Sequence, residues 1–325
     1  MATDLHEQLT KYLADAHSIE VQALAQLRTA PKLAGDPQLA HTFEEHLAET
    51  EGHERMTREL LDARGASPSK LKDLVMGVGG KGFLLFARLN PDTPGKLFAH
   101  SVSYEGLEVA SYELLLRVAE RAGEQDVADV ASRIRDEERA MLERLESLVE
   151  RAYAASQEAH PRDDAETLLP KYLADAHAIE EQAIQLLEKA PSLVDDAELA
   201  AIFADHLAET RDHAELVAAR IDAAGGDGPN RLQDAALRLG ALNWGMFFQA
   251  HPDTPGKLAA FAYAFEHLEI GGYELLQRHA AAVDDRETVA AVERILAEER
   301  AAAGRIAGAF DTAAAASLRA VGVPV

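Results

Sequence analysis

The sequence contains no cysteine. Disulfide bonds, thiolate metal sites, iron–sulfur clusters and cysteine nucleophiles are therefore excluded. Any metal ion held by this chain has to use carboxylate and imidazole ligands, which favours hard or borderline ions. Aromatic residues are also scarce, at 6% of the chain. This is low for a protein rich in β-strands, where aromatic side chains are enriched.

Basic residues and long hydrophobic runs are lacking as well. The chain has 32 Lys and Arg against 56 Asp and Glu, which gives a formal net charge of -24. Such a surface repels nucleic acid and anionic membranes, because both bind to basic surfaces. No apolar run approaches the ~18–20 residues of a membrane span, and the charged, amphipathic start is unlike a signal peptide. We therefore expect a cytoplasmic protein that binds neither nucleic acid nor membrane.

Helix-forming residues, in contrast, are abundant. Ala, Leu, Glu and Arg dominate the chain, and all four are strong helix formers. Hydrophobic residues make up 47% of the 325 residues, so the chain is long enough and apolar enough to form two domains of ordinary size. The composition predicts an all-helical protein.

The chain also repeats itself. The segment Lys11–Leu24 returns as Lys171–Ile184, and Tyr104–Arg117 returns as Phe265–Arg278, an offset of about 160 residues. Solenoid repeats have periods of only ~20–50 residues, so a period of this length indicates a duplicated domain. We predict one domain over residues 1–156 and its duplicate over residues 165–325, joined by a polar segment.

Each half has the pattern of four main helices. In the first half, Gly- and Pro-containing segments separate four amphipathic stretches, namely Leu5–Arg28, Pro37–Arg64, Thr93–Ala122 and Gln125–Ala154. A shorter helix, Lys70–Arg88, is predicted to cross between the second and third. The expected fold class is all-α, with two tandem four-helix bundles and an extra crossover helix in each.

Ionisable residues interrupt the apolar stripe of every main helix. An amphipathic helix shows its core face as apolar residues at i, i+3, i+4 and i+7. In the first half the interrupting residues are Glu20, His46, Glu49, His53, Glu105, Glu108, Glu137 and Glu138. In the second half they are Glu180, His206, Glu209, His213, Glu266, Glu269, Glu298 and Glu299.

A single Glu or His in such a stripe is more often a boundary residue than a ligand, so the argument rests on their coincidence. No Lys or Arg shares these stripes. Four or more carboxylates that meet inside a bundle cannot all stay ionised without cations. Two divalent metal ions would neutralise them, as in di-iron and di-manganese carboxylate bundles.

Several motifs resemble those of the ferritin-like superfamily, and are most similar to the bacterial YciF-type stress-protein group. They are HLAET on the second helix (His46–Thr50), EHLEIGGY on the third helix of the second half (Glu266–Tyr273), and the E-x-x-E pair Glu105 and Glu108. The resemblance covers nearly the whole of each half. The first half departs from it at Gly106, where the second half has His267.

The resemblance implies two iron or manganese ions in each half. The ligands that it implies are Glu20, Glu49, His53, Glu105, Glu108 and Glu137 in the first half, and Glu180, Glu209, His213, Glu266, Glu269 and Glu298 in the second. Alternative ligands are His46, Glu138, His206 and Glu299.

Two departures from the family pattern keep these alternatives open. The family has E-x-x-H on the second helix, whereas Glu49 and His53 are four residues apart and His46 precedes Glu49 by three. On the fourth helix, Ala140 and Ala301 occupy the position of the family's histidine. Each site is therefore richer in carboxylate, and manganese is as compatible with it as iron. Tyr112 and Tyr273 lie one turn beyond the third-helix Glu residues, where they could hydrogen-bond a ligand, although we favour core packing.

These observations favour a non-haem di-metal oxidoreductase that oxidises Fe(II), or reduces peroxide or oxygen, during stress. Its two ions would lie ~3.5–4 Å apart. The two halves would form a pseudo-dimer within one chain, and association into a homodimer stays open. The alternatives are a non-enzymatic, stress-related helical scaffold and a metal-binding or storage module without turnover.

Overall fold

The computed structural model describes residues 4–66, 93–159, 165–225 and 253–324. All regular secondary structure in these ranges is helical, and they contain no strand. The expected all-α fold of two helical halves is thus confirmed. The predicted crossover helix Lys70–Arg88 lies outside the described residues.

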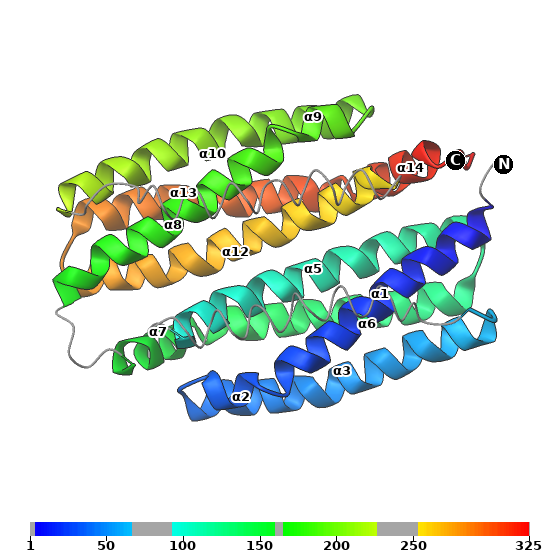
Figure 1. Cartoon of the computed structure of the whole chain (residues 1–325), viewed down its shortest axis with the longest axis horizontal. Helices are drawn as coiled ribbons and strands as arrows, with labels where there is room; N and C mark the ends of the chain where they lie inside the picture. The colour runs from blue at the N-terminus through cyan, green and yellow to red at the C-terminus, as the bar shows by residue number, and fades with distance from the viewer. Residues whose placement is uncertain (1–3, 67–92, 160–164, 226–252, 325) are drawn as a thin grey trace. The chain divides into compact units, whose positions relative to one another are not determined.

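The chain divides into two compact units. One comprises Met1–Pro161, with Gly322–Val325 assigned to it, and the other comprises Arg162–Val321. In the first unit the main helices are α1 (Leu5–Leu27), α3 (Pro37–Ala63), α5 (Thr93–Ala122) and α6 (Gln125–Ser147). Helix α1 packs on α3 and α5, and α6 packs on α5 and α3 (Figure 1). The four helices thus enclose a common interior.

The second unit repeats this arrangement. Its main helices are α8 (Ala165–Leu187), α10 (Ala197–Ala223), α12 (Thr254–Ala282) and α13 (Arg286–Gly308). Helix α8 packs on α10 and α12, and α13 packs on α12 and α10. The pairing is the same as in the first unit, as the internal repeat in the sequence leads one to expect.

The described residues also include four shorter helices. They are α2 (Ala30–Leu33), α7 (Val149–Glu158), α9 (Ala190–Leu193) and α14 (Phe310–Ala320). The prediction of one continuous helix over Gln125–Ala154 was wrong, because Leu148 leaves helical geometry at ψ 6° and its N–H bonds to Leu145 O. The break redirects the chain, and α7 then packs on α5 and α3.

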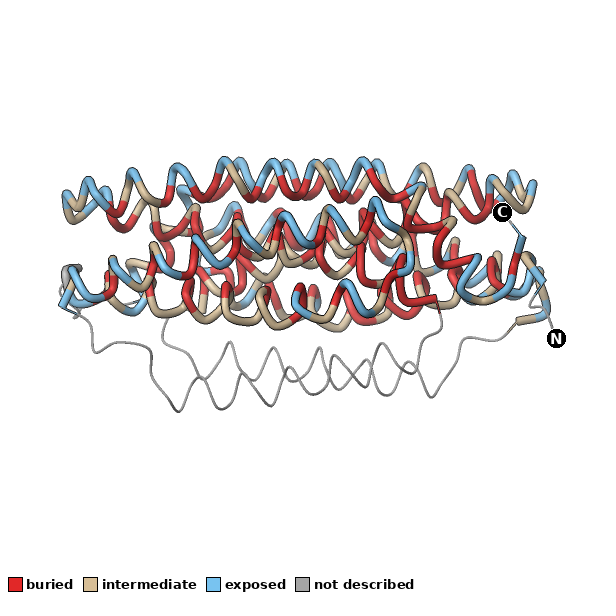
Figure 2. The backbone as a smooth tube through the Cα atoms, turned by 90° about the horizontal axis from the view of Figure 1, so that it is seen from above, coloured by how far each residue is buried: buried red, intermediate tan, exposed pale blue. Residues whose placement is uncertain are grey.

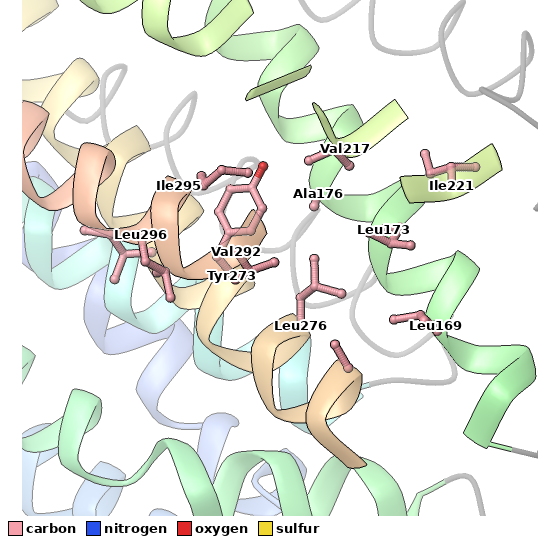
Figure 3. Packing of buried hydrophobic residues seen from close by; sticks show 12 residues of the cluster. Leu169, Leu173, Ala176, Val217, Ile221, Tyr273, Leu276, Val292, Ile295 and Leu296 are labelled. Carbon is pink, nitrogen blue, oxygen red and sulfur yellow. The ribbon is translucent and has the colours of Figure 1, made fainter. Parts of the chain in front are cut away.

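Apolar side chains fill the interior of each unit. Along each helix, buried stretches alternate with exposed ones (Figure 2), as expected for amphipathic helices with one inward face. In the second unit, Leu173, Tyr273 and Ile295 belong to a cluster that joins α8, α10, α12 and α13 (Figure 3). No helix in the described part of the chain is both long and apolar enough to cross a membrane.

Candidate metal centre

Six ionisable side chains meet inside the first unit. All of them are at most 3% exposed, and every main helix contributes at least one: Glu20 from α1, His46 and His53 from α3, Glu105 and Glu108 from α5, and Glu138 from α6. Helical spacing explains the pairs, because residues three or seven positions apart return to the same face. Each of these residues therefore points inward with the apolar stripe of its helix.

These side chains form two adjacent groups that share one carboxylate. One group consists of His46, Glu105, Glu108 and Glu138, and the other of Glu20, His53 and Glu138. Within each group, one candidate ligand atom per residue lies within 4.8 Å of all the others. Because Glu138 belongs to both, the two groups are neighbours across a single carboxylate.

The second unit contains the same two groups at equivalent positions. They are His206, Glu266, Glu269 and Glu299, and Glu180, His213 and Glu299. All six side chains are at most 1% exposed. Both halves of the duplicated chain therefore retain a complete set, with Glu299 in the shared position.

The individual distances show how closely the groups converge. His53 Nδ1 lies 2.7 Å from Glu138 Oε1, and His46 Nε2 lies 3.3 Å from Glu105 Oε2. None of these four atoms has a hydrogen-bond partner among the described residues. Lone pairs that converge on one point without bonding to each other are the arrangement that a shared cation requires.

Unpartnered oxygens are the main sign that these groups fit metal ions. A buried polar atom without a partner costs about 1–3 kcal/mol, and more when it is charged. Among the described residues, buried carboxylate oxygens with no hydrogen-bond partner occur on Glu20, Glu105, Glu108, Glu138, Glu180, Glu266, Glu269 and Glu299. All eight residues belong to the two-group centres, and divalent cations would satisfy their oxygens.

Each histidine of the first candidate centre also contacts a carboxylate outside the two groups. His46 Nδ1 lies 3.1 Å from Glu49 Oε2, and His53 Nε2 lies 2.7 Å from Glu137 Oε2. Glu49 and Glu137 are 38% and 35% exposed. Such a contact orients the imidazole and fixes its tautomer, which leaves the other ring nitrogen facing the interior.

The same outer contacts recur in the second unit. His206 Nδ1 lies 3.5 Å from Glu209 Oε2, and His213 Nε2 lies 2.6 Å from Glu298 Oε2. The structure thus places four of the expected ligands, Glu49, Glu137, Glu209 and Glu298, outside the groups. The four residues named as alternatives, His46, Glu138, His206 and Glu299, lie inside them.

Two tyrosines hold the carboxylates of the first helices. Tyr112 OH donates a hydrogen bond to Glu20 Oε1, and Tyr273 OH donates one to Glu180 Oε1. Both rings are also fully buried, so these residues combine core packing with the alternative role of hydrogen bonding to a candidate ligand. The bond satisfies one carboxylate oxygen and leaves the other, Oε2, without a partner among the described residues.

Burial changes the protonation of the carboxylates. It raises the pKa of Glu20 to about 8, with the neighbouring Glu138 adding to the effect, and it raises the pKa of Glu105 to about 7. The pKa of Glu108 is also raised well above its usual value by burial and then by Glu138. Glu138 differs, because His46 and His53 outweigh its burial and lower its pKa.

Burial acts on the histidines with the opposite sign, whereas the neighbouring carboxylates raise their pKa values too. Burial alone would lower the pKa of His53, but Glu138 and Glu20 raise it to about 9. The pKa of His46 is raised well above its usual value, since Glu105 and Glu138 outweigh burial. Without metal the centre therefore retains protons at neutral pH, and bound cations would displace them.

Comparison with known proteins places the chain in a family. The family model described as "Domain of unknown function (DUF892)" matches residues 4–158 and, a second time, residues 164–319. The internal duplication is thereby confirmed. No solved structure matches the chain. Because the two matches cover nearly all of the sequence, the chain belongs to the DUF892 family and carries two tandem copies of its domain.

Proposed function

We propose that each half of this chain holds a two-metal centre of the ferritin-like kind and uses it for oxidation of Fe(II) or reduction of peroxide or oxygen under stress. The observation that carries the proposal is the pair of buried groups that share Glu138, or Glu299 in the second half. The resemblance of the HLAET and EHLEIGGY motifs to YciF-type proteins supports the same conclusion.

The proposed ligands follow the two groups. Glu20, His53 and Glu138 would hold one ion, and His46, Glu105, Glu108 and Glu138 would hold the other. In this assignment Glu49 and Glu137 orient the histidines and do not bind metal, because both are bonded to ring nitrogens and partly exposed. Helix α6 has Ala140 where the family has a histidine, but α3 supplies two histidines, His46 and His53, so the centre still contains two imidazoles.

The donor set suits iron and manganese. Four carboxylates and two imidazoles are hard to borderline ligands, and no thiolate is present to select softer ions. Either metal, when bound, supplies one-electron redox chemistry that could pass electrons to oxygen or peroxide.

The surrounding residues would prepare the centre for such chemistry. Tyr112 holds Glu20 Oε1 and leaves Oε2 facing the group. The apolar side chains around the centre lower the local dielectric constant, and this strengthens the electrostatic interactions within it. A purely structural scaffold would have no use for eight buried carboxylates with unpartnered oxygens, so this observation favours the metal centre over the scaffold.

Single-turnover oxidation of bound Fe(II) tests this function. The protein is loaded with Fe(II) under anaerobic conditions and mixed rapidly with hydrogen peroxide or with oxygen-saturated buffer. We expect oxidation well above the rate of free Fe(II), and loss of this excess in the double variant Glu108→Gln/Glu269→Gln. Glu59→Gln, an exposed change on α3, is the matched control and should leave the rate unchanged. Equal rates for the protein and free Fe(II) would contradict the proposal.

A further inference from the structure

The first unit has a pocket that leads to its candidate metal centre. It lies among α1, α2 and α5, and its polar lining consists of Gln26, Ser101, Tyr104 and Glu105. Its empty volume is about 350 Å³, open solvent included. Glu105 is buried and belongs to the His46 group, whereas the other three polar residues are only partly buried. The described lining of the pocket thus combines partly exposed polar residues with one buried candidate ligand.

The polar lining is held in place by hydrogen bonds. Tyr104 OH donates to Ile19 O over 2.9 Å, next to the candidate ligand Glu20. The Gln26 side chain is held by His100, whose Nε2 lies 2.8 Å from Gln26 Oε1. No Lys or Arg is among the described residues that line the pocket.

The second half keeps the apolar lining of this pocket and its carboxylate, but it lacks the other polar lining residues. Ala23, Leu27, Ala30 and Leu97 have identical counterparts, Ala183, Leu187, Ala190 and Leu258, and Glu105 corresponds to Glu266. In contrast, Gln26, His100, Ser101 and Tyr104 are replaced by Leu186, Phe261, Ala262 and Phe265. Among the lining residues, the copies thus differ only at side chains that can form hydrogen bonds.

We propose that this pocket admits a small, neutral, hydrogen-bonding molecule of the water or hydrogen peroxide type to the first centre, and that the second centre admits it more slowly. Such a molecule gives up hydrogen bonds to water when it enters the bundle, at a cost that polar lining groups offset and apolar ones do not. The absence of Lys and Arg from the described lining, together with the Glu105 carboxylate, disfavours anions. The inference rests on the proposed metal centres.

Exchanging the linings between the two halves tests this proposal in the full chain. The variant Gln26→Leu/His100→Phe/Ser101→Ala/Tyr104→Phe gives the first half the lining of the second. The reverse variant is Leu186→Gln/Phe261→His/Ala262→Ser/Phe265→Tyr. Each introduced residue already occurs at the equivalent position of the other half, so both variants are expected to fold and to bind metal.

The first readout requires no turnover. In protein loaded with Mn(II), the relaxation rate of solvent water protons per bound ion reports how readily water reaches the metal. We expect the first variant to lower this rate and the reverse variant to raise it.

The second readout is oxidation of bound Fe(II) by hydrogen peroxide, which should show a fast and a slow phase. The first variant should slow the fast phase about tenfold, while oxidation by dioxygen, which is apolar, should be unaffected.

The outcomes separate this inference from the proposed function. Both variants could bind Mn(II) fully and show unchanged relaxation rates and unchanged peroxide phases. This result would overturn the proposed entry route without contradicting the metal centres. Protein that binds no Mn(II) at all would overturn the centres and the inference together. A first variant that slows peroxide and dioxygen equally would overturn the claim that hydrogen bonding in the pocket matters.

Discussion

Glu138 is the residue on which the first centre depends most. It belongs to both groups, it is fully buried, and its pKa is lowered by His46 and His53. We predict that Glu138→Gln removes about two ions from each chain, since both ions of a two-metal centre share this ligand. The second half should keep its metal. Elemental analysis of the purified variant measures this, and wild-type metal content would contradict the assignment.

Glu49→Gln is the matched comparison on α3. Glu49 contacts His46 Nδ1 from the exposed side and lies in neither group. Loss of such an orienting contact typically weakens metal affinity by about 10–100-fold and leaves the stoichiometry intact. Titration of metal-free protein with Mn(II) distinguishes the two variants. If Glu49→Gln abolished one ion completely, Glu49 would be a ligand, as the family resemblance implies.

The pKa values predict how the stability of metal-free protein depends on pH. Folding raises the pKa of Glu20 from 4.5 to about 8, that of Glu105 from 4.5 to about 7, and that of His53 from 6.5 to about 9. All three groups bind protons more tightly in the folded state, so their contribution to stability falls as pH rises. In the second half, Glu180 and His213 shift in the same direction, to about 8 and about 9.

We therefore expect the thermal unfolding midpoint of metal-free protein to decrease between about pH 6.5 and pH 9. Saturation with Mn(II) should oppose this trend, because metal binding requires deprotonated ligands and strengthens as protons leave. Thermal unfolding followed by circular dichroism, with and without Mn(II), measures both curves. A midpoint of metal-free protein that rises over this range would show that the buried groups do not retain protons.

The sequence could predict which helices contribute to the centre, but not which of two neighbouring carboxylates points inward. Glu137 and Glu138 are adjacent and differ by about 100° around the helix axis. The choice between them depends on the rotation of α6 against α3 and α5, which is set by packing. His46 and Glu49 share one helix face, so spacing alone could not separate the inner residue from the outer one. The four interior positions Glu20, His53, Glu105 and Glu108 were named correctly as members of the cluster, and their role as ligands stays a prediction.

At the scale of the elements, Asp36 joins the start of α3 to α7. Asp36 Oδ1 accepts hydrogen bonds from the backbone N–H groups of Gln38 and Leu39, at 2.8 and 2.9 Å, and Arg151 Nη1 donates to Oδ2 over 3.1 Å. The second unit repeats this arrangement with Asp196 and Arg319. Helix α3, which carries His46 and His53 of the first centre, is thereby anchored at its first turn.

We predict that Asp36→Ala lowers the free energy of unfolding by about 1–2 kcal/mol through loss of the helix cap. Asp36→Asn keeps a side-chain oxygen for the cap and loses only the charge opposite Arg151, so it should cost less than 1 kcal/mol, as is typical of exposed ion pairs. Urea unfolding of metal-free protein measures both. Equal losses for the two variants would show that the ion pair with Arg151, rather than the cap, stabilises this end of α3.

Helix ends were predicted well where the sequence contains Gly or Pro. The predicted ends at Arg28 and Arg64 lie one residue beyond α1 and α3. The break at Leu148 was missed because no Gly or Pro marks it, and the sequence pattern alone does not show that α7 packs on α5 and α3. Helix α2 was missed because a single turn of four residues, with Pro31 inside it, reads as a loop.

At the scale of the whole molecule, the duplication gives each half its own complete set of six inward-facing groups. Neither set borrows a residue from the other half, so the two centres should load independently. The domain limits 1–156 and 165–325 stay a prediction, as does the pseudo-dimer. A formal net charge of -24 on the chain also favours uptake of divalent cations from solution.

Metal content is the measurement that tests this account most directly. The protein is purified after expression with iron or with manganese and analysed for both elements. The account predicts about four ions per chain, two for each half, as in two-metal carboxylate bundles. A protein that is isolated without metal, and that stays empty after anaerobic addition of Fe(II), would contradict it.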